Sequence, residues 1–375
     1  MISSKFFIDK LVSNGLDFFA GVPDSLLKNV CAYITDNIDS NRNLIAANEG
    51  GAIGLAAGHY LATGKAGVVY MQNSGEGNII NPLLSLVDKE VYAIPVLLVI
   101  GWRGRPGVHD EPQHVKQGKV TLTLLETMGV SYEVLSREES EVAIQIEKAI
   151  AAVNAGEIYA LVIEKDTFDT YKLQKNEVLK KLTMTREEAI IEVASSIEKN
   201  AVIVSTTGMI SRELFEHRTR QNEVHERDFL TVGSMGHASQ IALGIALEKQ
   251  NRPVYCFDGD GASIMHMGNM AIVAQQNPMN YVHVIFNNGA HDSVGGQPTV
   301  GLKIDLPAVA KAVGYRNVFH VETLDELKAA LTKIKTINGT TFLEVCVKKG
   351  NRKDLGRPTI TPVQNKEALM EFLKK

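Results

Sequence analysis

The stretch VYCFDGDGASIMHMGNMAIVAQQNPMNYVHVIFNN, residues 254–288, contains the pattern that decides the predicted fold. An apolar strand, Val254–Phe257, runs directly into the turn residues 258–261 (DGDG). A helical segment is predicted over Ala262–Gln276, and a second strand follows at Val282–Asn287. A strand, a helix and a strand in this order are typical of a parallel sheet that is covered by helices.

The same alternation of short β-branched runs and longer helical patterns extends through the whole chain. In the first half it predicts strands at Phe18–Gly21, Leu44–Ala47, Gly67–Met71, Val96–Gly101, Ser131–Leu135 and Tyr159–Glu164, with helices such as Gly51–Thr63 and Ser140–Asn154. In the second half it predicts further strands at Ala201–Ser205, Phe229–Val232 and Thr341–Val347. We therefore expect an α/β protein with two parallel-sheet domains.

A polar stretch between the two halves marks the predicted domain boundary. It is rich in Lys, Asp and Gln and poor in branched aliphatic residues, so residues 171–184 are predicted to be a linker. The first domain is then expected at residues 1–170 and the second at residues 185–375. Thr185 and Glu188 have the spacing of a capping box, which indicates a helix start.

Composition limits the class of protein. The chain has 375 residues with 45% hydrophobic and 22% charged residues, which suits two globular domains. A net charge of -4 gives no sign of nucleic-acid binding, and the apolar run Tyr92–Ile100 is too short for a membrane span. The N-terminus lacks a signal-peptide pattern and the three cysteines are far apart, so we expect a reduced cytoplasmic protein.

Polar residues at two predicted strand ends indicate a metal and phosphate site. Asp260 and Asn288 follow neighbouring strands, where ligands of open α/β sheets bind. Their oxygens suit Mg²⁺ better than a softer metal. Gly259 and Gly261 let the backbone come close to a ligand, and the helix that follows offers free N–H groups to a phosphate.

Taken together, this stretch resembles the signature of thiamine-diphosphate enzymes. The resemblance implies that Mg²⁺ is held by Asp260, Asn288 and the main-chain carbonyl of Ala290. The segments 233–236 (GSMG) and 205–208 (STTG) resemble further walls of the same cofactor pocket. The cofactor-binding residues implied in this half are Thr207, Gly208, Ser234, Met235, Gly259, Asp260, Gly261, Ala262 and Asn288.

The first half offers a carboxyl at the end of an apolar strand, which calls for a reason because a buried unpaired carboxylate is costly. Glu49 stands in the run NEGGA, residues 48–52, and the resemblance implies that it is the glutamate that activates the aminopyrimidine of the cofactor. Ser74 and Gly75 lie in a loop, residues 74–78 (SGEGN), that resembles the family's pyrimidine-contacting loop.

The resemblance covers nearly the whole chain in the order pyrimidine-binding then diphosphate-binding domain, and the linker leaves no room for the middle domain of larger relatives. In this family one cofactor lies between the first domain of one subunit and the second domain of another. The resemblance therefore implies a homo-oligomer, a dimer at least, with active sites between subunits.

Further segments resemble the phosphonopyruvate and sulfopyruvate decarboxylases, namely residues 21–25, 101–106, 109–114 and 288–297. The resemblance implies an acidic residue, Asp24, and a histidine, either His109 or His114, that handle protons. An anionic substrate favours guanidinium partners, for which Arg103, Arg105 and Arg212 are the candidates.

The substrate implied by this resemblance is a small anionic 2-oxo acid. The expected reaction converts 3-phosphonopyruvate to phosphonoacetaldehyde and CO₂ through a thiamine-diphosphate ylid. Sulfopyruvate decarboxylation and another thiamine-diphosphate carboligase reaction stay open as alternatives. Because some sulfopyruvate enzymes split the two domains onto separate subunits, one fused chain favours phosphonopyruvate.

Overall fold

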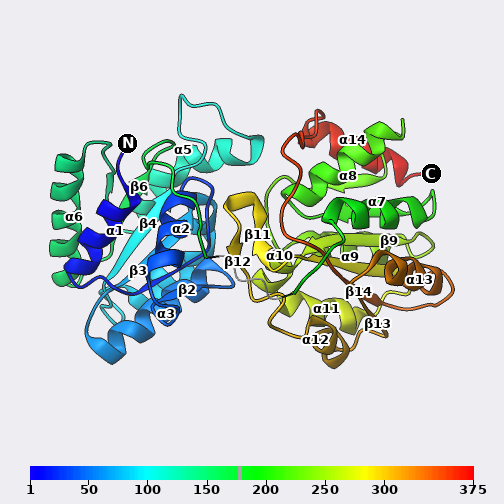
Figure 1. Ribbon diagram of the computed structural model, residues 1–375, viewed down its shortest axis with the longest axis horizontal. Coiled ribbons are helices and arrows are strands. Elements are labelled where there is room, and N and C mark those ends of the chain that lie inside the picture. Colours follow the sequence, from blue (N-terminus) through cyan, green and yellow to red (C-terminus); the bar gives the residue numbers. More distant parts are fainter. Residues whose placement is uncertain (176–179) are drawn as a thin grey trace. The chain divides into compact units, whose positions relative to one another are not determined.

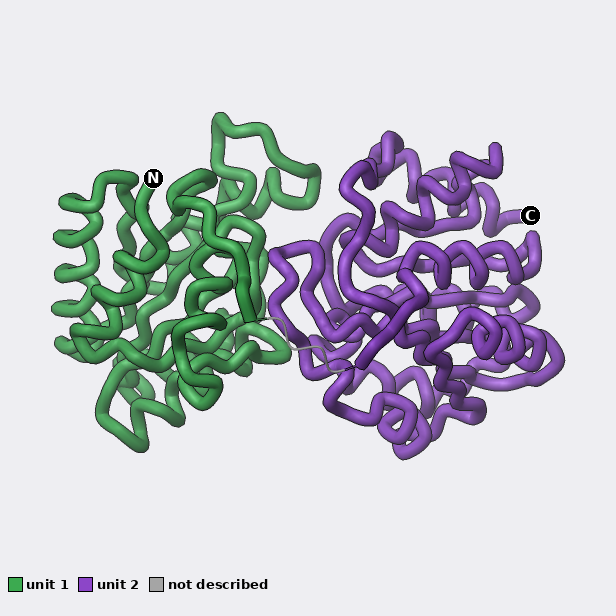
Figure 2. Tube along the Cα trace, viewed as in Figure 1, with its two compact units in different colours: residues 1–177 green, residues 178–375 purple. Residues whose placement is uncertain are grey.

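The computed structural model describes residues 1–175 and 180–375 (Figure 1). The chain forms two compact units, Met1–Glu177 and Val178–Lys375 (Figure 2). The division falls within the predicted linker, residues 171–184, of which residues 176–179 lie outside the described residues. Each unit has its own sheet and its own core, so each is described by itself.

Unit 1 is built from parallel strands and helices that alternate along the chain. Its strands are β1 (Phe19–Gly21), β2 (Asn43–Ile45), β3 (Gly67–Gln72), β4 (Val96–Gly101), β5 (Ser131–Val134) and β6 (Tyr159–Ile163). Its helices are α1 (Ser4–Ser13), α2 (Lys28–Asn37), α3 (Glu49–Thr63), α4 (Glu76–Pro82), α5 (Pro112–Thr127) and α6 (Glu139–Asn154), with a 3-10 turn η1 (Asn73–Gly75) and a π-helical turn η2 (Leu83–Val87).

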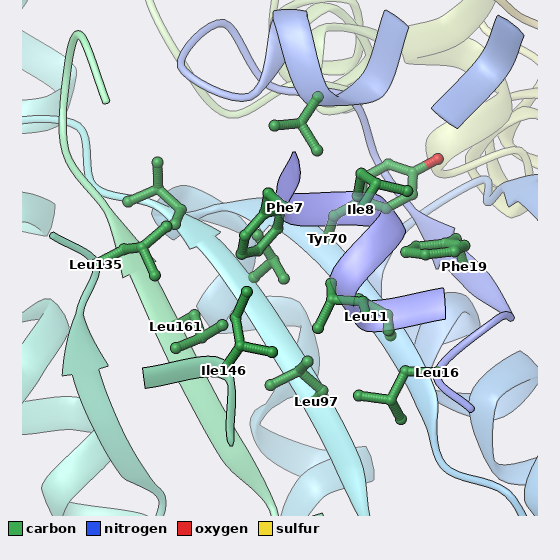
Figure 3. Packing of buried hydrophobic residues seen from close by; sticks show 14 of the residues in the cluster. Phe7, Ile8, Leu11, Leu16, Phe19, Tyr70, Leu97, Leu135, Ile146 and Leu161 are labelled. Atoms are coloured by element: carbon green, nitrogen blue, oxygen red, sulfur yellow. The ribbon is translucent and has the colours of Figure 1, made fainter. Parts of the chain in front are cut away.

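The sheet of unit 1 has six parallel strands in the order β2-β1-β3-β4-β6-β5. Both of its faces are apolar, and each is covered by helices. Helices α1, α2 and α6 contribute to the core on one face, where Phe7, Ile8 and Leu11 of α1 share a cluster with Leu97 and Leu161 of the sheet (Figure 3). Residues of α3, α4 and α5 form the second cluster. Each large side chain buried there contributes roughly 1.5–3 kcal/mol.

Unit 2 repeats the same architecture. Its main strands are β7 (Val202–Ser205), β8 (Asp228–Leu230), β9 (Val254–Gly259), β10 (Tyr281–Asn287), β13 (Asn317–Val321) and β14 (Thr341–Cys346), and a hairpin pairs β11 (Ala290–His291) with β12 (Gln297–Pro298). Its helices are α7 (Arg186–Ser196), α8 (Met209–Arg220), α9 (Ala238–Glu248), α10 (Asp260–Met265), α11 (Gly268–Gln276), α12 (Leu306–Val313), α13 (Leu324–Ile334) and α14 (Pro362–Phe372), with a 3-10 turn η3 (Asp292–Val294).

The main sheet of unit 2 also has six parallel strands, in the order β13-β14-β10-β9-β7-β8. Helices α7, α8 and α13 contribute to the core on one face, and α9, α11, α12 and α14 contribute to the core on the other. The predicted capping box at the start of α7 is present, since Thr185 and Glu188 bond reciprocally. Two parallel sheets covered by helices confirm the predicted α/β fold class.

The structure corrects one predicted helix and adds the strands β11, β12 and β13 to those predicted. The segment predicted as a single helix, Ala262–Gln276, belongs to two helices, because the backbone leaves helical geometry at His266 (φ -132°, ψ 52°). Strand β13 has no counterpart among the strands predicted from sequence. No helix in the described part of the chain has the length and apolar character needed to cross a membrane.

Candidate active site

Four neighbouring strands of unit 1 end at one edge of the sheet and carry most of the predicted residues of this half. The strands are adjacent and parallel in the order β2-β1-β3-β4. Along this edge Glu49 follows β2, Asp24 follows β1, residues 73–78 follow β3 and Arg103 follows β4. Since ligands of parallel sheets bind beyond the carboxyl ends of strands, this edge is the candidate half-site of unit 1.

Glu49 is the first residue of α3 and is 5% exposed. Asn48 caps the helix by accepting the N–H of Gly51, which fixes where α3 begins. The side chain of Asn78 donates to Glu49 Oε2 at 2.7 Å. Gly75 packs directly on the carboxyl, and a Cβ at that position would lie 2.5 Å from Glu49 Oε1. The predicted loop, residues 74–78, therefore contacts the carboxyl of Glu49, which the sequence analysis also selected.

Asp24 is fully buried beside the same loop. Its Oδ1 accepts a hydrogen bond from Gln72 at 2.5 Å, and its Oδ2 accepts the main-chain N–H of Leu26 at 2.9 Å. Ser74 donates to Gln72 Oε1 at 2.8 Å, so a chain of hydrogen bonds links the predicted loop to Asp24 through Gln72. Burial raises the pKa of Asp24 above its ordinary value. Asp24 can therefore hold a proton where an exposed carboxyl would not.

Two of the three predicted substrate arginines lie in unit 1, and both already have carboxylate partners. Arg103 donates through Nε to Asp110 Oδ2 at 2.7 Å and through Nη2 to the other oxygen, and its Nη1 bonds Ser25 at 2.7 Å. Arg105 pairs with Glu164 at 2.8 Å and is half-exposed. These ion pairs satisfy both guanidinium groups within the chain.

The two candidate histidines lie in different environments. His109 is exposed in the loop before α5. His114 is buried in the first turn of that helix, and burial, aided by the charge of Arg103, lowers its pKa to about 4. The imidazole of His114 is therefore neutral at physiological pH and is a poor proton donor. Its Nδ1 has no hydrogen-bond partner among the described residues.

In unit 2 the strands β10, β9, β7 and β8 are adjacent in this order, and their carboxyl ends carry the predicted metal and diphosphate residues. Asp260 follows β9 as the first residue of α10 and is 2% exposed. Burial raises the pKa of Asp260 to about 6, an effect that the hydroxyl of Thr299 and the N–H of Asn288 oppose. No ion pair in the described part of the chain involves Asp260, so its carboxylate fits a bound cation.

Asn288 and Ala290 lie at the end of the neighbouring strand, β10, and both are buried. Asn288 Oδ1 accepts the N–H of Ala290 at 3.0 Å, and its amide donates to Asp292 Oδ2 at 2.7 Å. Arg186 donates to the same Asp292 oxygen at 3.0 Å and forms two bonds with Glu213, at 2.8 and 2.9 Å. This buried network fixes the Asn288 side chain, so the three predicted metal ligands are brought to one edge.

The loops after β7 and β8 complete the unit 2 half-site. Thr207 and Gly208 immediately precede α8, whose first N–H groups are open to an anion. The neighbouring Thr206 hydroxyl is buried and has no hydrogen-bond partner among the described residues, so a donor is available for a phosphate oxygen. Ser234 has a positive φ of 53°, a conformation that costs energy outside glycine, and Met235 beside it is half-buried.

Three further predicted residues lie around Asp260. Gly259 ends β9, and Gly261 and Ala262 continue α10 after it. The ring of His291 packs against Gly261, which leaves no space for a side chain at that position. Gly301 packs directly against the Asp260 carboxyl, so residue 301 likewise has no space for a side chain.

Arg212 differs from the other two predicted arginines. It lies in the first turns of α8, just beyond residues 206–208, and is half-buried. Burial lowers its pKa, and no ion pair in the described ranges satisfies its charge. A guanidinium without a counter-ion beside a helix N-terminus makes this edge of unit 2 suited to an anion.

Comparison with known proteins decides the family. Residues 1–124 match the model "Thiamine pyrophosphate enzyme, N-terminal TPP binding domain", and residues 206–345 match the corresponding C-terminal TPP binding domain. A phosphonopyruvate decarboxylase of Streptomyces viridochromogenes is 34% identical over 97% of this chain and 93% of its own length. The chain belongs to the thiamine pyrophosphate enzymes. Its cofactor is accordingly thiamine diphosphate, and the family resemblance drawn from the sequence is confirmed.

Other relatives of this thiamine pyrophosphate enzyme have related activities. A phosphonopyruvate decarboxylase of Streptomyces hygroscopicus is 34% identical over 99% of this chain and 94% of its own length. A sulfopyruvate decarboxylase of Methanosarcina acetivorans is 29% identical over 97% and 95%. The chain is therefore a thiamine-diphosphate-dependent carboxy-lyase, and its described residues form the two units given above.

Several polar residues of this thiamine pyrophosphate enzyme lie in the half-sites although the sequence assigned them no role of their own, even where they stand in a segment that it singled out. In unit 1 these are Gln72, Asn73, Glu76 and Asp110, and in unit 2 they are Arg186, Thr206, Asp292 and Thr299. Most of them share one feature, a polar side chain that contacts a predicted site residue. Most of them contact residues distant in sequence, so spacing alone does not reveal them.

Proposed function

We propose that this enzyme decarboxylates 3-phosphonopyruvate to phosphonoacetaldehyde and CO₂ with thiamine diphosphate and Mg²⁺. The observation that carries the proposal is the identity of 34% along nearly the full length of two phosphonopyruvate decarboxylases. The lower identity to a full-length sulfopyruvate decarboxylase, 29%, makes sulfopyruvate the second candidate substrate. The guanidinium of Arg212, which has no counter-ion among the described residues, supports a substrate that carries a second anionic group.

Each half-site residue has a proposed role. When bound, thiamine diphosphate accepts the electron pair that the departing CO₂ leaves behind. Asp260, Asn288 and Ala290 would hold Mg²⁺ through oxygen atoms, and Glu49 holds a proton at the pyrimidine ring. The reaction consumes a proton, since a carboxylate is replaced by hydrogen, and buried Asp24 is the group best suited to deliver it. Of the two candidate histidines, His114 is buried and His109 is exposed, so His114 is the one proposed to act together with Asp24.

The experiment that tests this proposal is CO₂ release from phosphonopyruvate, sulfopyruvate and pyruvate with added thiamine diphosphate and Mg²⁺. We expect the highest kcat/KM with phosphonopyruvate. A higher kcat/KM with sulfopyruvate would make sulfopyruvate the proposed substrate and would leave the proposed reaction class unchanged. Absence of CO₂ release from all three acids, together with C–C bond formation between added aldehydes, would favour a carboligase.

We predict that Arg212→Gln raises the KM for phosphonopyruvate by about tenfold or more, because a charge-assisted hydrogen bond to the substrate is lost. Arg105→Gln is the matched control, since Arg105 is half-exposed and is paired with Glu164. Steady-state kinetics of both variants and calorimetric titration with thiamine diphosphate check the prediction. If Arg212→Gln weakens cofactor binding and leaves the substrate KM unchanged, the guanidinium belongs to the diphosphate pocket instead.

The enzyme is further proposed to be a dimer or a higher homo-oligomer whose subunits share each cofactor. One helix face of unit 1 supports this. On α3, Leu55 and Leu61 are 37% and 75% exposed, and Gly54 and Gly58 on the same helix have no neighbouring atom within 4 Å of an added Cβ. An apolar face with glycines at helical spacing permits close packing of a second helix, and a second copy of this chain is the proposed occupant.

We predict that Leu55→Lys lowers the molecular mass measured by sedimentation, because a charged side chain would have to be buried in the subunit contact. Leu247→Lys on α9 is the matched control, since Leu247 is 38% exposed. If active sites form between subunits, the variant with the lower molecular mass should also bind thiamine diphosphate more weakly. A Leu55→Lys protein with unchanged mass at micromolar concentration would contradict this choice of face.

A further inference from the structure

One buried carboxyl of unit 2 lies next to the proposed metal residues and has no part in the roles assigned above. Glu344 is the only charged residue of β14 and is 3% exposed, in a strand that is buried throughout. In the sheet β14 is adjacent to β10, where Ile285 is the Cα partner of Glu344. A buried carboxylate requires hydrogen-bond donors, because its removal from water is costly. The donors that Glu344 contacts therefore indicate what it does.

Both carboxylate oxygens of Glu344 have partners from neighbouring strands. Oε1 accepts a hydrogen bond from the side-chain amide of Asn287 at 2.7 Å. Oε2 lies 2.7 Å from Nδ1 of His320, which is the Cα partner of Glu344 on β13. The His320 side chain is 40% exposed, and its Nε2 lies 3.0 Å from Glu322 Oε1. The carboxylate is thus fixed by His320 on its outer side and bonds Asn287 with its other oxygen.

The side-chain amide of Asn287, the last residue of β10, is fully buried and fully used. Besides its bond to Glu344, Nδ2 donates to the main-chain carbonyl of Gly301 at 2.8 Å. Oδ1 accepts the main-chain N–H of Gly289 at 3.1 Å. An amide has two protons to donate, and these bonds use both of them. Only one orientation of the Asn287 amide therefore satisfies every partner.

The loops of Gly289 and Gly301, which Asn287 joins, also contact each other and the proposed ligand Asp260. Gly301 packs directly against the Asp260 carboxyl, and its N–H donates to the Thr299 hydroxyl at 3.1 Å. That hydroxyl donates to Asp260 Oδ2, and the main-chain N–H of Thr299 donates to the Gly289 carbonyl at 2.9 Å. Gly289 stands between the other two proposed ligands in the chain. One closed network, with Asn287 as a shared member, thus includes the surroundings of all three ligands.

We infer that Glu344 is a positioning residue for the metal half-site, because its carboxylate orients the Asn287 amide and this amide holds the two loops beside the proposed Mg²⁺ ligands. The inference rests on the proposed function through the metal role given to Asp260 and its neighbours. Without Glu344 one buried N–H of Asn287 would lack its acceptor, which is unfavourable enough to displace the amide. The contacts with Gly289 and Gly301 would then be disturbed, and with them the spacing of the ligands.

The test is the Mg²⁺ dependence of thiamine diphosphate binding, measured by calorimetric titration of the full chain. Glu344→Met removes the acceptor and keeps the side-chain length, so we expect half-maximal cofactor binding to need about tenfold more Mg²⁺. Glu344→Gln keeps a carbonyl oxygen for Asn287 and should stay within about threefold of wild type. Glu322→Met is the matched control, since Glu322 contacts His320 through the ring nitrogen that Glu344 does not use.

The conservative variant separates positioning from a merely structural role. A Glu344→Met protein with the Mg²⁺ requirement of wild type would overturn the inference, whatever its melting temperature. The inference would also be wrong if Glu344→Gln were as impaired as Glu344→Met, because the acceptor is retained in the glutamine. If Glu344→Met fails to fold, Asn287→Leu removes the other partner of the same bond at nearly constant shape, and the same increase in the Mg²⁺ requirement is expected.

A second readout needs neither metal nor substrate. Main-chain hydrogen exchange of residues 288–301, measured by mass spectrometry on the protein without cofactor, reports on both loops. We expect faster exchange in Glu344→Met and wild-type exchange in Glu344→Gln and Glu322→Met. Unchanged exchange in Glu344→Met would contradict the inference. If no 2-oxo acid is decarboxylated, or if wild type binds the cofactor equally well without Mg²⁺, the proposed function or its metal site fails, while hydrogen exchange still decides whether Glu344 holds the loops.

Discussion

Glu49→Gln is expected to lower kcat with phosphonopyruvate by about a hundredfold or more, while thiamine diphosphate still binds. The carboxyl is the only feature that the substitution removes, because glutamine has the same shape and its oxygen can still accept the bond from Asn78. A glutamine cannot share a proton with the pyrimidine ring, which is the role proposed for Glu49. The close contact with Gly75 should be kept, since the number of heavy atoms is unchanged.

Steady-state kinetics and calorimetric titration with the cofactor separate the two effects. Glu90→Gln is a suitable control, since Glu90 is exposed in the same unit and the substitution removes the same charge. A Glu49→Gln enzyme with wild-type turnover would show that Glu49 has no role in cofactor activation. Loss of cofactor binding without residual turnover would show that the carboxyl contributes to binding and not only to chemistry.

The parallel sheets could be predicted from the sequence because central strands are buried on both faces. The run Val96–Gly101 is apolar throughout and was predicted with the bounds of β4. Strand β13 was missed because it lies at the sheet edge and most of its residues, Asn317–Val321, are only partly buried. The break between α10 and α11 was missed because helix periodicity continues across His266, whose backbone conformation depends on tertiary packing.

The positions of Glu49 and Asp260 at strand ends could be predicted from the sequence, whereas their roles stay predictions. Charge compensation could not be predicted, because it depends on partners from other elements. Arg105 and its partner Glu164 belong to different strand ends, and nothing in the sequence pairs them. The sequence alone therefore left three arginines equivalent as substrate groups, and the structure distinguishes Arg212, which has no counter-ion among the described residues.

Asp260→Ala is expected to weaken Mg²⁺-dependent binding of thiamine diphosphate by about a hundredfold or more, since one charged oxygen ligand is lost. The carboxylate is buried next to Asn288, and no described cation pairs with it, so its charge is available to a metal ion. Because Asn288 is fixed by Asp292 and Arg186, the alanine variant should keep the remaining two ligands in place. The expected loss is thus specific to metal-assisted binding and does not require unfolding of the loop.

Calorimetric titration with the cofactor in Mg²⁺, and again with a chelator in place of Mg²⁺, measures this loss. The wild-type affinity should drop on chelation, whereas the affinity of Asp260→Ala should be equally weak in both conditions. Asp325→Ala, an exposed position on α13, controls for the removed charge. An Asp260→Ala titration that still responds to Mg²⁺ as wild type does would exclude Asp260 as a metal ligand, because a neutral methyl group cannot replace a carboxylate oxygen in the coordination of a hard cation.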